Sequence, residues 1–245
     1  MESFIGTSGW SYNHWKGVFY PLNLSKSKWF DFYCKRFNTV EVNATFYRRF
    51  KDEVFIRWKA ASPENFRFVL KMPGIITHTK KLKNVEKDIE EFIRQASLLG
   101  KKLGCILMQL PPFMTYNPEL LRNALGNFDN KIHVAVEFRN ESWMIKESVE
   151  LLRSSSAIYC NADSPAGMLN EWVTSDTVYF RMHGRNNWYR YDYSYQELKR
   201  VACLLHNTDQ HHIKTAYIFF NNDFQGHAPQ NAASLIEIIK EENFR

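Results

Sequence analysis

The stretch K-I-H-V-A-V-E-F-R-N-E-S-W, Lys131–Trp143, decides the fold because it reads as a strand that ends in charged residues. On an extended chain Val134 and Val136 fall on one side, and Glu137 and Arg139 fall on the other. Burying an acid or a guanidinium alone is costly. An acid and a cation that share one face at the end of an apolar strand therefore need partners or a ligand.

The rest of the chain repeats this design. Seven further segments are predicted to be strands: Phe4–Ser8, Thr39–Phe46, Phe66–Met72, Cys105–Leu110, Ala157–Asp163, Thr177–His183 and Thr215–Phe220. Helical patterns are predicted between or after them: Ser27–Phe37, Lys51–Ala61, Val85–Leu99, Pro118–Leu125, Glu147–Ser154, Tyr195–Leu205 and Pro229–Lys240. Between Ala157–Asp163 and Thr177–His183 the sequence shows no clear helix, and Pro165 and Gly167 indicate an irregular sixth unit.

Alternation of strands and helices favours a parallel sheet with crossover helices. Eight such units in 245 residues favour a closed (β/α)₈ TIM-type barrel over an open doubly wound sheet. The absence of a glycine-rich dinucleotide fingerprint after any strand supports the same choice. Because no linker or low-complexity stretch interrupts the chain, we expect one domain over residues 1–245.

Composition narrows the class of protein. Hydrophobic residues are 44% and charged residues 24% of the chain, as in soluble globular proteins. The four cysteines lack CxxC spacing, which argues against a zinc site or a disulfide framework and fits a reducing cytosol. No apolar run approaches the roughly 20 residues that span a bilayer, and the first residues do not resemble a signal peptide. We therefore expect a cytoplasmic protein without membrane contact.

The polar residues at the strand ends predict the functional site, because the active site of such a barrel lies at the carboxyl ends of its strands. Bulky apolar residues hold one parity of the strands, so the polar parity should point into the barrel. The inward acids are then Glu41, Glu137 and Asp163, and the inward cations are Lys71, Arg139 and Arg181. Ser8, Asn43, Gln109, His183 and Asn221 complete this polar ring.

Within the ring we predict Glu137, Glu41 and His183 as catalytic residues. Glu137 would be the general acid or base, since cations and aromatic walls can tune the pKa of a carboxylate. His183 would transfer a proton or donate a hydrogen bond. The remaining ring residues would bind substrate: Asn43, Lys71, Gln109, Arg139, Asp163, Arg181 and Asn221. The alternative is a structural ion-pair network that closes the barrel.

Loops above the ring supply further candidates. Trp10 and Tyr12, in the first loop, are predicted to contact substrate, and aromatic and arginine residues of Arg185–Tyr191 could stack on rings and bind phosphate. Alternatively, these rings pack together as a lid. After the last strand, Gly226, His227 and Asn231 precede or open a helix and predict an anion site. An ordinary strand-to-helix turn is the alternative there.

No metal ligands are assigned. Carboxylates and histidines of suitable type occur, but no metal-binding motif does, and the nearby lysines and arginines would compete. No cofactor is predicted, and a divalent metal is kept as an alternative.

Several motifs resemble the YecE-like family, a family of TIM-type barrels of unknown function. They are G-T-S-G-W-S-Y (Gly6–Tyr12), V-E-V-N-A-T-F-Y (Val40–Tyr47), M-Q-L-P-P (Met108–Pro112), V-E-F-R-N-E-S-W (Val136–Trp143), F-R-M-H-G-R (Phe180–Arg185), F-F-N-N-D (Phe219–Asp223) and G-H-A-P-Q-N-A (Gly226–Ala232). The resemblance implies the barrel fold and supplies no catalytic assignment.

These patterns predict an enzyme of unassigned class, a hydrolase, isomerase or lyase, acting on a small polar substrate that is phosphorylated or sugar-like. The net charge of +6 keeps open a nucleic-acid-binding or phosphodiester-processing barrel. A non-catalytic binding module is the third reading. The sequence sets no oligomeric state.

Overall fold

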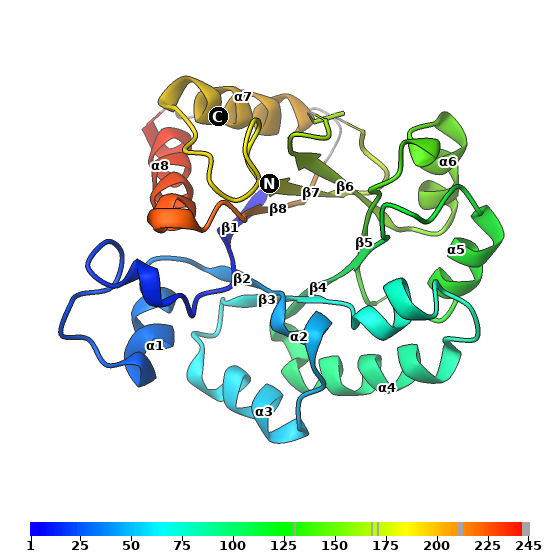
Figure 1. Ribbon diagram of the computed structural model, residues 1–245, viewed down its shortest axis with the longest axis horizontal. Helices are drawn as coiled ribbons and strands as arrows, with labels where there is room; N and C mark the ends of the chain where they lie inside the picture. The colour runs from blue at the N-terminus through cyan, green and yellow to red at the C-terminus, as the bar shows by residue number, and fades with distance from the viewer. Residues whose placement is uncertain (130, 168, 171, 210–212, 242–245) are drawn as a thin grey trace. The chain divides into compact units, whose positions relative to one another are not determined.

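Eight parallel strands close a barrel in chain order in the computed structural model of the protein (Figure 1). The structure describes residues 1–129, 131–167, 169–170, 172–209 and 213–241. The strands are β1 (Glu2–Ser8), β2 (Thr39–Val42), β3 (Arg67–Lys71), β4 (Leu103–Gln109), β5 (Val134–Glu137), β6 (Ile158–Asp163), β7 (Thr177–Met182) and β8 (Thr215–Phe220). The predicted TIM-type α/β barrel is confirmed.

Helices follow most of the strands. They are α1 (Trp29–Cys34), α2 (Ala44–Tyr47), α3 (Asp52–Ala61), α4 (Glu86–Ala96), α5 (Pro118–Leu125), α6 (Lys146–Ser154), α7 (Tyr195–Asp209) and α8 (His227–Glu241). Short 3₁₀ turns add Asn13–Trp15, Lys26–Lys28, Ser97–Lys102, Glu141–Trp143 and Phe224–Gly226. Gly100, the residue after the predicted helix Val85–Leu99, has a left-handed backbone, φ 58°, which glycine adopts without steric cost.

The chain divides into two compact units, each described here by itself. Unit 1 comprises Met1–Glu41, Asn161–Glu171 and Asp176–Arg245, and unit 2 comprises Val42–Cys160 and Trp172–Ser175. In unit 1, β1 pairs with β8 and β7 pairs with β8. In unit 2, β3, β4 and β5 pair in sequence. The expectation of a single domain stays a prediction.

The second strand is shorter than predicted. It ends at Val42, and Asn43 already has helical angles, φ −74° and ψ −19°. The Thr45 hydroxyl lies 2.8 Å from the carbonyl oxygen of Val42 and 2.6 Å from that of Lys71, so it supports a turn where the strand pattern continues. Alternation beyond Val42 therefore predicted the wrong backbone for Asn43 and Thr45.

The segment after β3 contains a π-helical turn at Ile75–Thr79. Ile76 and Thr77 are buried within it. π-Helical turns are rare in proteins, and those that occur are often found at functional sites. This turn contains His78 and sets its position, which strand periodicity could not predict.

The sixth unit is irregular, as predicted. No helix occurs among the described residues between β6 and β7. Instead, the Thr174 hydroxyl accepts a hydrogen bond from Tyr159 N at 2.8 Å and donates one to Ala157 O at 2.7 Å. Trp172 packs on Tyr159 with ring centroids 5.0 Å apart. One side chain thus satisfies backbone groups at the start of β6.

The end of the Lys131–Trp143 stretch serves packing. Trp143 is fully buried and stacks on Phe138 with ring centroids 4.7 Å apart and planes 7° from parallel. Its indole N–H donates to Met114 O at 2.9 Å. Asn140 caps the intervening turn by accepting a hydrogen bond from Ser142 N. This packing fixes the chain directly after Glu137 and Arg139.

Within the part of the chain that is described, no helix combines the length and apolarity that a membrane crossing needs.

Candidate functional site

Glu41, the next-to-last residue of β2, is held by four hydrogen bonds in unit 1. Its Oε1 accepts from Ser8 Oγ at 2.7 Å and from Arg181 Nη2 at 2.6 Å. Its Oε2 accepts from Tyr179 Oη at 2.6 Å and from Arg181 Nε at 3.0 Å. Tyr179 and Arg181 are two residues apart on β7, so strand alternation turns both toward the same carboxylate.

These partners keep Glu41 ionised. Burial favours the neutral acid, but the Arg181 charge and the hydrogen bonds from Arg181, Tyr179 and Ser8 outweigh it and hold the pKa of Glu41 below its usual value. Each oxygen already accepts two hydrogen bonds, which is close to the capacity of a carboxylate. The geometry thus fits Glu41 as an anion that orients Arg181, and its predicted catalytic role stays a prediction.

Asp163, the last residue of β6, is a carboxylate of the opposite kind in the same unit. It is 0% exposed, and Oδ2 accepts a hydrogen bond from Arg185 Nε at 3.0 Å. Oδ1 is buried and has no hydrogen-bond partner among the described residues. Burial raises the pKa of Asp163, although Arg185 and a hydrogen bond from Tyr193 oppose that effect. The pKa values of Asp163 and Glu41 are therefore shifted in opposite directions.

Arg185 connects Asp163 to the start of α7. Its Nη1 lies 3.0 Å from Oε1 of Glu197, which also accepts from Tyr191 Oη at 2.7 Å. Oε2 of Glu197 accepts from both the backbone N and the hydroxyl of Ser194 at 2.8 Å. Sequence reasoning missed Glu197. The pattern S-Y-Q-E at residues 194–197 is a capping box, and it was the signal that could have found this residue.

His183 lies directly after β7 and is fully buried. Its Nδ1 is 3.0 Å from Nδ2 of Asn221, which can only donate, so the neutral ring carries its proton on Nε2. The rings of Trp188 and Tyr189 lie 5.4 and 6.1 Å from the imidazole. This arrangement fits His183 as a hydrogen-bond donor from Nε2, and its catalytic role stays a prediction.

In unit 2 the predicted pair at the end of β5 is in contact. Arg139 Nη2 lies 2.5 Å from Glu137 Oε1. Glu137 is fully buried, whereas the Arg139 side chain is 14% exposed. Gln109 pairs with Glu137 in the β4–β5 register. The partly exposed Arg139 side chain therefore lies between the buried Glu137 carboxylate and solvent.

Lys71 ends β3 and is 8% exposed. Its ammonium group lies 4.2 Å from the ring centroid of Phe46. Burial, and after it the charge of Lys71, lowers the pKa of the neighbouring His78. His78 was not among the predicted site residues, because the sequence around it has no periodicity. Asn43 precedes α2, and its buried Oδ1 has no hydrogen-bond partner among the described residues.

The first loop packs largely upon itself in unit 1. Trp15 and Tyr20 are buried, and Tyr20 stacks on Trp29 with ring centroids 4.6 Å apart. The predicted substrate contacts Trp10 and Tyr12 are half-buried. Tyr12 donates to Ser8 O at 2.5 Å, and Trp10 O accepts from Tyr20. The alternative of a packed lid describes the inner rings, and a ligand contact by Trp10 or Tyr12 stays a prediction.

The residues predicted to bind an anion, Gly226, His227 and Asn231, make structural contacts within unit 1. Asn231 Oδ1 accepts from Tyr193 N and Asn222 Nδ2, and its Nδ2 donates to Asp192 and to Tyr193 O. His227 Nδ1 lies 3.7 Å from a carboxylate oxygen of Asp192. At Gly226, φ 82°, a Cβ would approach Val18 to 2.7 Å. The anion site stays a prediction, and the nearby carboxylate of Asp192 disfavours it.

No group of three or more potential metal-ligating His, Cys, Asp and Glu side chains is found within the described ranges. Fold and geometry together define the class of this protein. It is a TIM-type barrel with buried carboxylates at its strand ends, and these carboxylates are paired with arginines.

The chain belongs to the family described as "Protein of unknown function DUF72", which it matches over residues 4–245. UPF0759 protein YunF of Bacillus subtilis (strain 168) is 25% identical over 273 residues, covering 96% of this chain and 94% of YunF. UPF0759 protein YecE of Escherichia coli (strain K12) is 29% identical over 150 residues, which are 60% of this chain and 52% of YecE. The predicted YecE-like membership is confirmed.

Two crystal structures share the fold. A DUF72 family protein from Thermotoga maritima MSB8 is 31% identical with a TM-score of 0.90, covering 98% of this chain and 100% of that one. A DUF72 family protein from Enterococcus faecalis V583 is 22% identical with a TM-score of 0.85, covering 97% and 95%. The latter likeness concerns the fold alone.

Proposed function

We propose that the protein is an enzyme that acts on a small polar substrate, phosphorylated or sugar-like, by carboxylate acid–base chemistry at the carboxyl ends of the barrel strands. The observation that carries the proposal is the contrast between two buried carboxylates of unit 1. Glu41 accepts four hydrogen bonds, whereas Asp163 keeps one buried oxygen without a partner among the described residues. Environments that separate two carboxylates in this way define acid and base roles in enzymes.

The proposed roles of Glu41 and Asp163 both differ from the sequence-based ones. In unit 1, Asp163 carries a proton transfer, and Glu41 serves as the anion that fixes Arg181. In unit 2, Glu137 is the acid or base, and Arg139 binds an anionic group, because a guanidinium fork matches phosphate and carboxylate geometry. His183 donates a hydrogen bond from Nε2. Asn43, Lys71, Gln109 and Asn221 are proposed as further substrate contacts, and the choice among hydrolase, isomerase and lyase is left to the substrate screen.

We further propose that the protein works in a reducing cytosol. Cys34, Cys105, Cys160 and Cys203 form no disulfide in the structure. Several cysteines without a disulfide are typical of proteins in a reducing compartment.

The test is a substrate screen with matched variants. Purified protein is screened for thermal stabilisation by phosphorylated and sugar-like metabolites, and the hits are assayed for turnover. Glu137→Gln and Asp163→Asn are each expected to lower kcat by 10²-fold or more, in the range of general acid–base catalysis, while retaining binding. Glu237→Gln, at an exposed pair with Lys240, is the control and should keep full activity. Unchanged turnover in both carboxylate variants would refute the proposed roles.

Asp163 also predicts a pH dependence of stability. Because burial raises the folded-state pKa of Asp163 above its ordinary value, ionisation of Asp163 opposes folding, and stability is lost as pH rises through the folded pKa. The difference in unfolding free energy between Asp163→Asn and wild type should therefore shift in favour of the variant as pH rises from about 4. Urea midpoints at several pH values measure it.

Glu41→Gln supplies the internal comparison for this measurement. The pKa of Glu41 is lowered, so its favourable contribution is present above the unfolded-state pKa and lost on acidification. The Glu41→Gln difference should consequently shift against the variant as pH rises. If the unfolding free-energy differences of Asp163→Asn and Glu41→Gln changed with pH in the same direction, the two carboxyl groups would not have opposite pKa shifts.

A further inference from the structure

Four aromatic rings form a continuous series on unit 2, here called the aromatic ladder: Tyr47, Phe46, His78 and Phe113. Tyr47 and Phe46 belong to α2, and their centroids are 4.9 Å apart. Phe46 meets His78 edge-on at 4.7 Å, and His78 meets Phe113 at 6.4 Å. The series therefore joins the ends of β2, β3 and β4.

The outer rings of the ladder are unusually exposed. Tyr47 is 79% exposed and Phe113 is 58% exposed. Scattered apolar side chains on a surface need no explanation, but contiguous aromatic rings mark interaction sites. Two large rings that end one connected series thus point to a ligand with planar groups.

Cations lie against the faces of these rings. The Lys71 ammonium is 4.2 Å from the centroid of Phe46, and that of Lys81 is 5.1 Å from the centroid of Phe113. Arg48, the residue after α2, places its guanidinium 4.6 Å from the centroid of Phe50, a ring outside the ladder. The ladder therefore combines stacking surfaces with positive charge.

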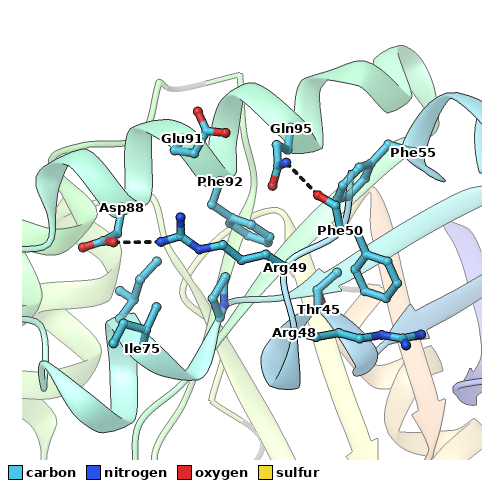
Figure 2. Close-up of a pocket in the computed structure, with 12 residues that line it drawn as sticks. Thr45, Arg48, Arg49, Phe50, Phe55, Ile75, Asp88, Glu91, Phe92 and Gln95 are labelled. Atoms are coloured by element: carbon cyan, nitrogen blue, oxygen red, sulfur yellow. Dashed lines mark hydrogen bonds and ion pairs between the residues drawn. The ribbon is translucent and has the colours of Figure 1, made fainter. Parts of the chain in front are cut away.

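The adjoining groove shows which arginine is available to a ligand. In Figure 2, Arg49 extends toward α4, where its guanidinium lies 3.2 Å from Asp88 Oδ1. Arg48 extends in a different direction, and it is exposed. The groove itself, with a volume near 20 Å³, holds no more than a water molecule. Binding must consequently use the exposed rings and Arg48 rather than the groove.

The ladder is held in place before any ligand arrives. The Thr45 hydroxyl ties α2 to the ends of β2 and β3, and Thr77 Oγ1 lies 2.8 Å from His78 Nδ1. At Gly74 an added Cβ would come within 2.9 Å of the Phe46 ring, which shows how closely that ring is packed. A preorganised platform loses little conformational entropy on binding.

We propose that the aromatic ladder binds single-stranded nucleic acid, with bases stacked on Tyr47 and Phe113 and phosphates bound by Lys81 and Arg48. Unpaired bases expose the faces that such stacking needs, whereas the bases of a duplex are already stacked. A neutral sugar would need the rings but not the cations, and an acidic peptide would need the cations but not the rings. The net charge of +6 has the sign that a polyanion requires. This inference does not use Glu41, Glu137 or Asp163, so it and the proposed enzyme activity can fail separately.

The test measures fluorescence anisotropy of a labelled oligo-dT and a labelled oligo-U of about ten nucleotides, within the site sizes of stacking platforms. The full chain is titrated at 50 and 200 mM salt. Tyr47→Ala and Phe113→Ala are each expected to weaken binding about ten-fold, the typical effect of one stacked base. Lys81→Gln should reduce the slope of log affinity against log salt by about 0.7.

The matched control is Tyr195→Ala, which removes another exposed tyrosine, 52% exposed and outside the ladder. It should bind as wild type does. Because Tyr47, Phe113 and Tyr195 are all exposed, their loss should leave the fold intact, and circular dichroism verifies this. Failure of a duplex of the same length to compete would support the inference.

Three results would overturn it: no binding at 50 mM salt, equal affinity of Tyr47→Ala and wild type, or binding of a mononucleotide as tight as that of the oligomer. The second result would indicate attraction by net charge alone. The third would indicate a small-ligand site.

Discussion

Replacing Arg181 with methionine should destabilise the protein by about 3–5 kcal/mol at neutral pH, the usual cost of removing one partner of a buried ion pair. Arg181 is 1% exposed and contributes two of the four hydrogen bonds to Glu41. Without it, Tyr179 and Ser8 remain as the two donors to a fully buried carboxylate. The unfolding free energy from urea denaturation measures the loss.

The pH dependence identifies the cause of that loss. In Arg181→Met the effect of burial on Glu41 is no longer outweighed, so its folded-state pKa rises above the unfolded value. The contribution then reverses sign: stability is present below the unfolded pKa and lost as pH rises through the folded one. We expect the deficit of the variant to shrink on acidification. A pH-independent deficit would indicate lost packing instead of an uncompensated charge.

Two further variants isolate the pair. The double variant Glu41→Gln/Arg181→Met removes both charges and should recover much of the lost stability, because the uncompensated carboxylate is gone. Arg94→Met breaks an exposed bidentate pair with Asp52, and its effect should be small since solvent screens such pairs. If the double variant were as unstable as the sum of its singles, the two side chains would not be coupled.

Strand alternation predicted which residues lie on which face as long as the strand continued. It placed Glu137 with Arg139, and these side chains are in contact. Alternation failed after Val42, where the backbone becomes helical. There the Thr45 hydroxyl lies within hydrogen-bond distance of the carbonyl oxygens of Val42 and Lys71. A period of two residues contains no information about such side-chain-to-backbone hydrogen bonds.

Partners distant in sequence were beyond prediction. Arg181 and Glu41 are 140 residues apart, and nothing in either segment specifies the other. The sequence therefore indicated that buried acids and cations must pair, but the structure was needed to show that Glu41 is saturated while Asp163 is not. Glu197 was the exception, because the capping box at Ser194 could have identified it.

The aromatic ladder had no sequence signal of its own. Phe46 was assigned to the end of a predicted strand and Tyr47 to no element, and His78 and Phe113 lie in connections without periodicity. Their meeting depends on where α2 and the π-helical turn Ile75–Thr79 place them. Only the coordinates could therefore separate the packed rings of the first loop from the exposed rings of the ladder.

Replacing Gly6 with alanine should cost about 3 kcal/mol or more, because overpacking against backbone exceeds what a core usually absorbs. Gly6 lies in β1, and a Cβ built there would stand 2.3 Å from Thr39 O and 3.0 Å from Tyr33 Oη. That tyrosine hydroxyl donates to Thr39 O at 3.0 Å and accepts from Thr7 N at 2.9 Å. The added methyl group would push apart β1 and the start of β2 and break this buried hydrogen-bonded centre.

Gly167→Ala is the control for this prediction, since a Cβ at Gly167 meets no described atom within 4 Å. Urea denaturation should find it within about 0.5 kcal/mol of wild type. Tyr33→Phe, combined with Gly6→Ala, separates the two contacts. The double variant should recover little stability, because the carbonyl oxygen of Thr39 remains in the way when the hydroxyl is gone. Full recovery would show that the side chain, and not the backbone, requires glycine at position 6, and the G-T-S-G-W segment would then be constrained by Tyr33 rather than by the closeness of β1 to Thr39.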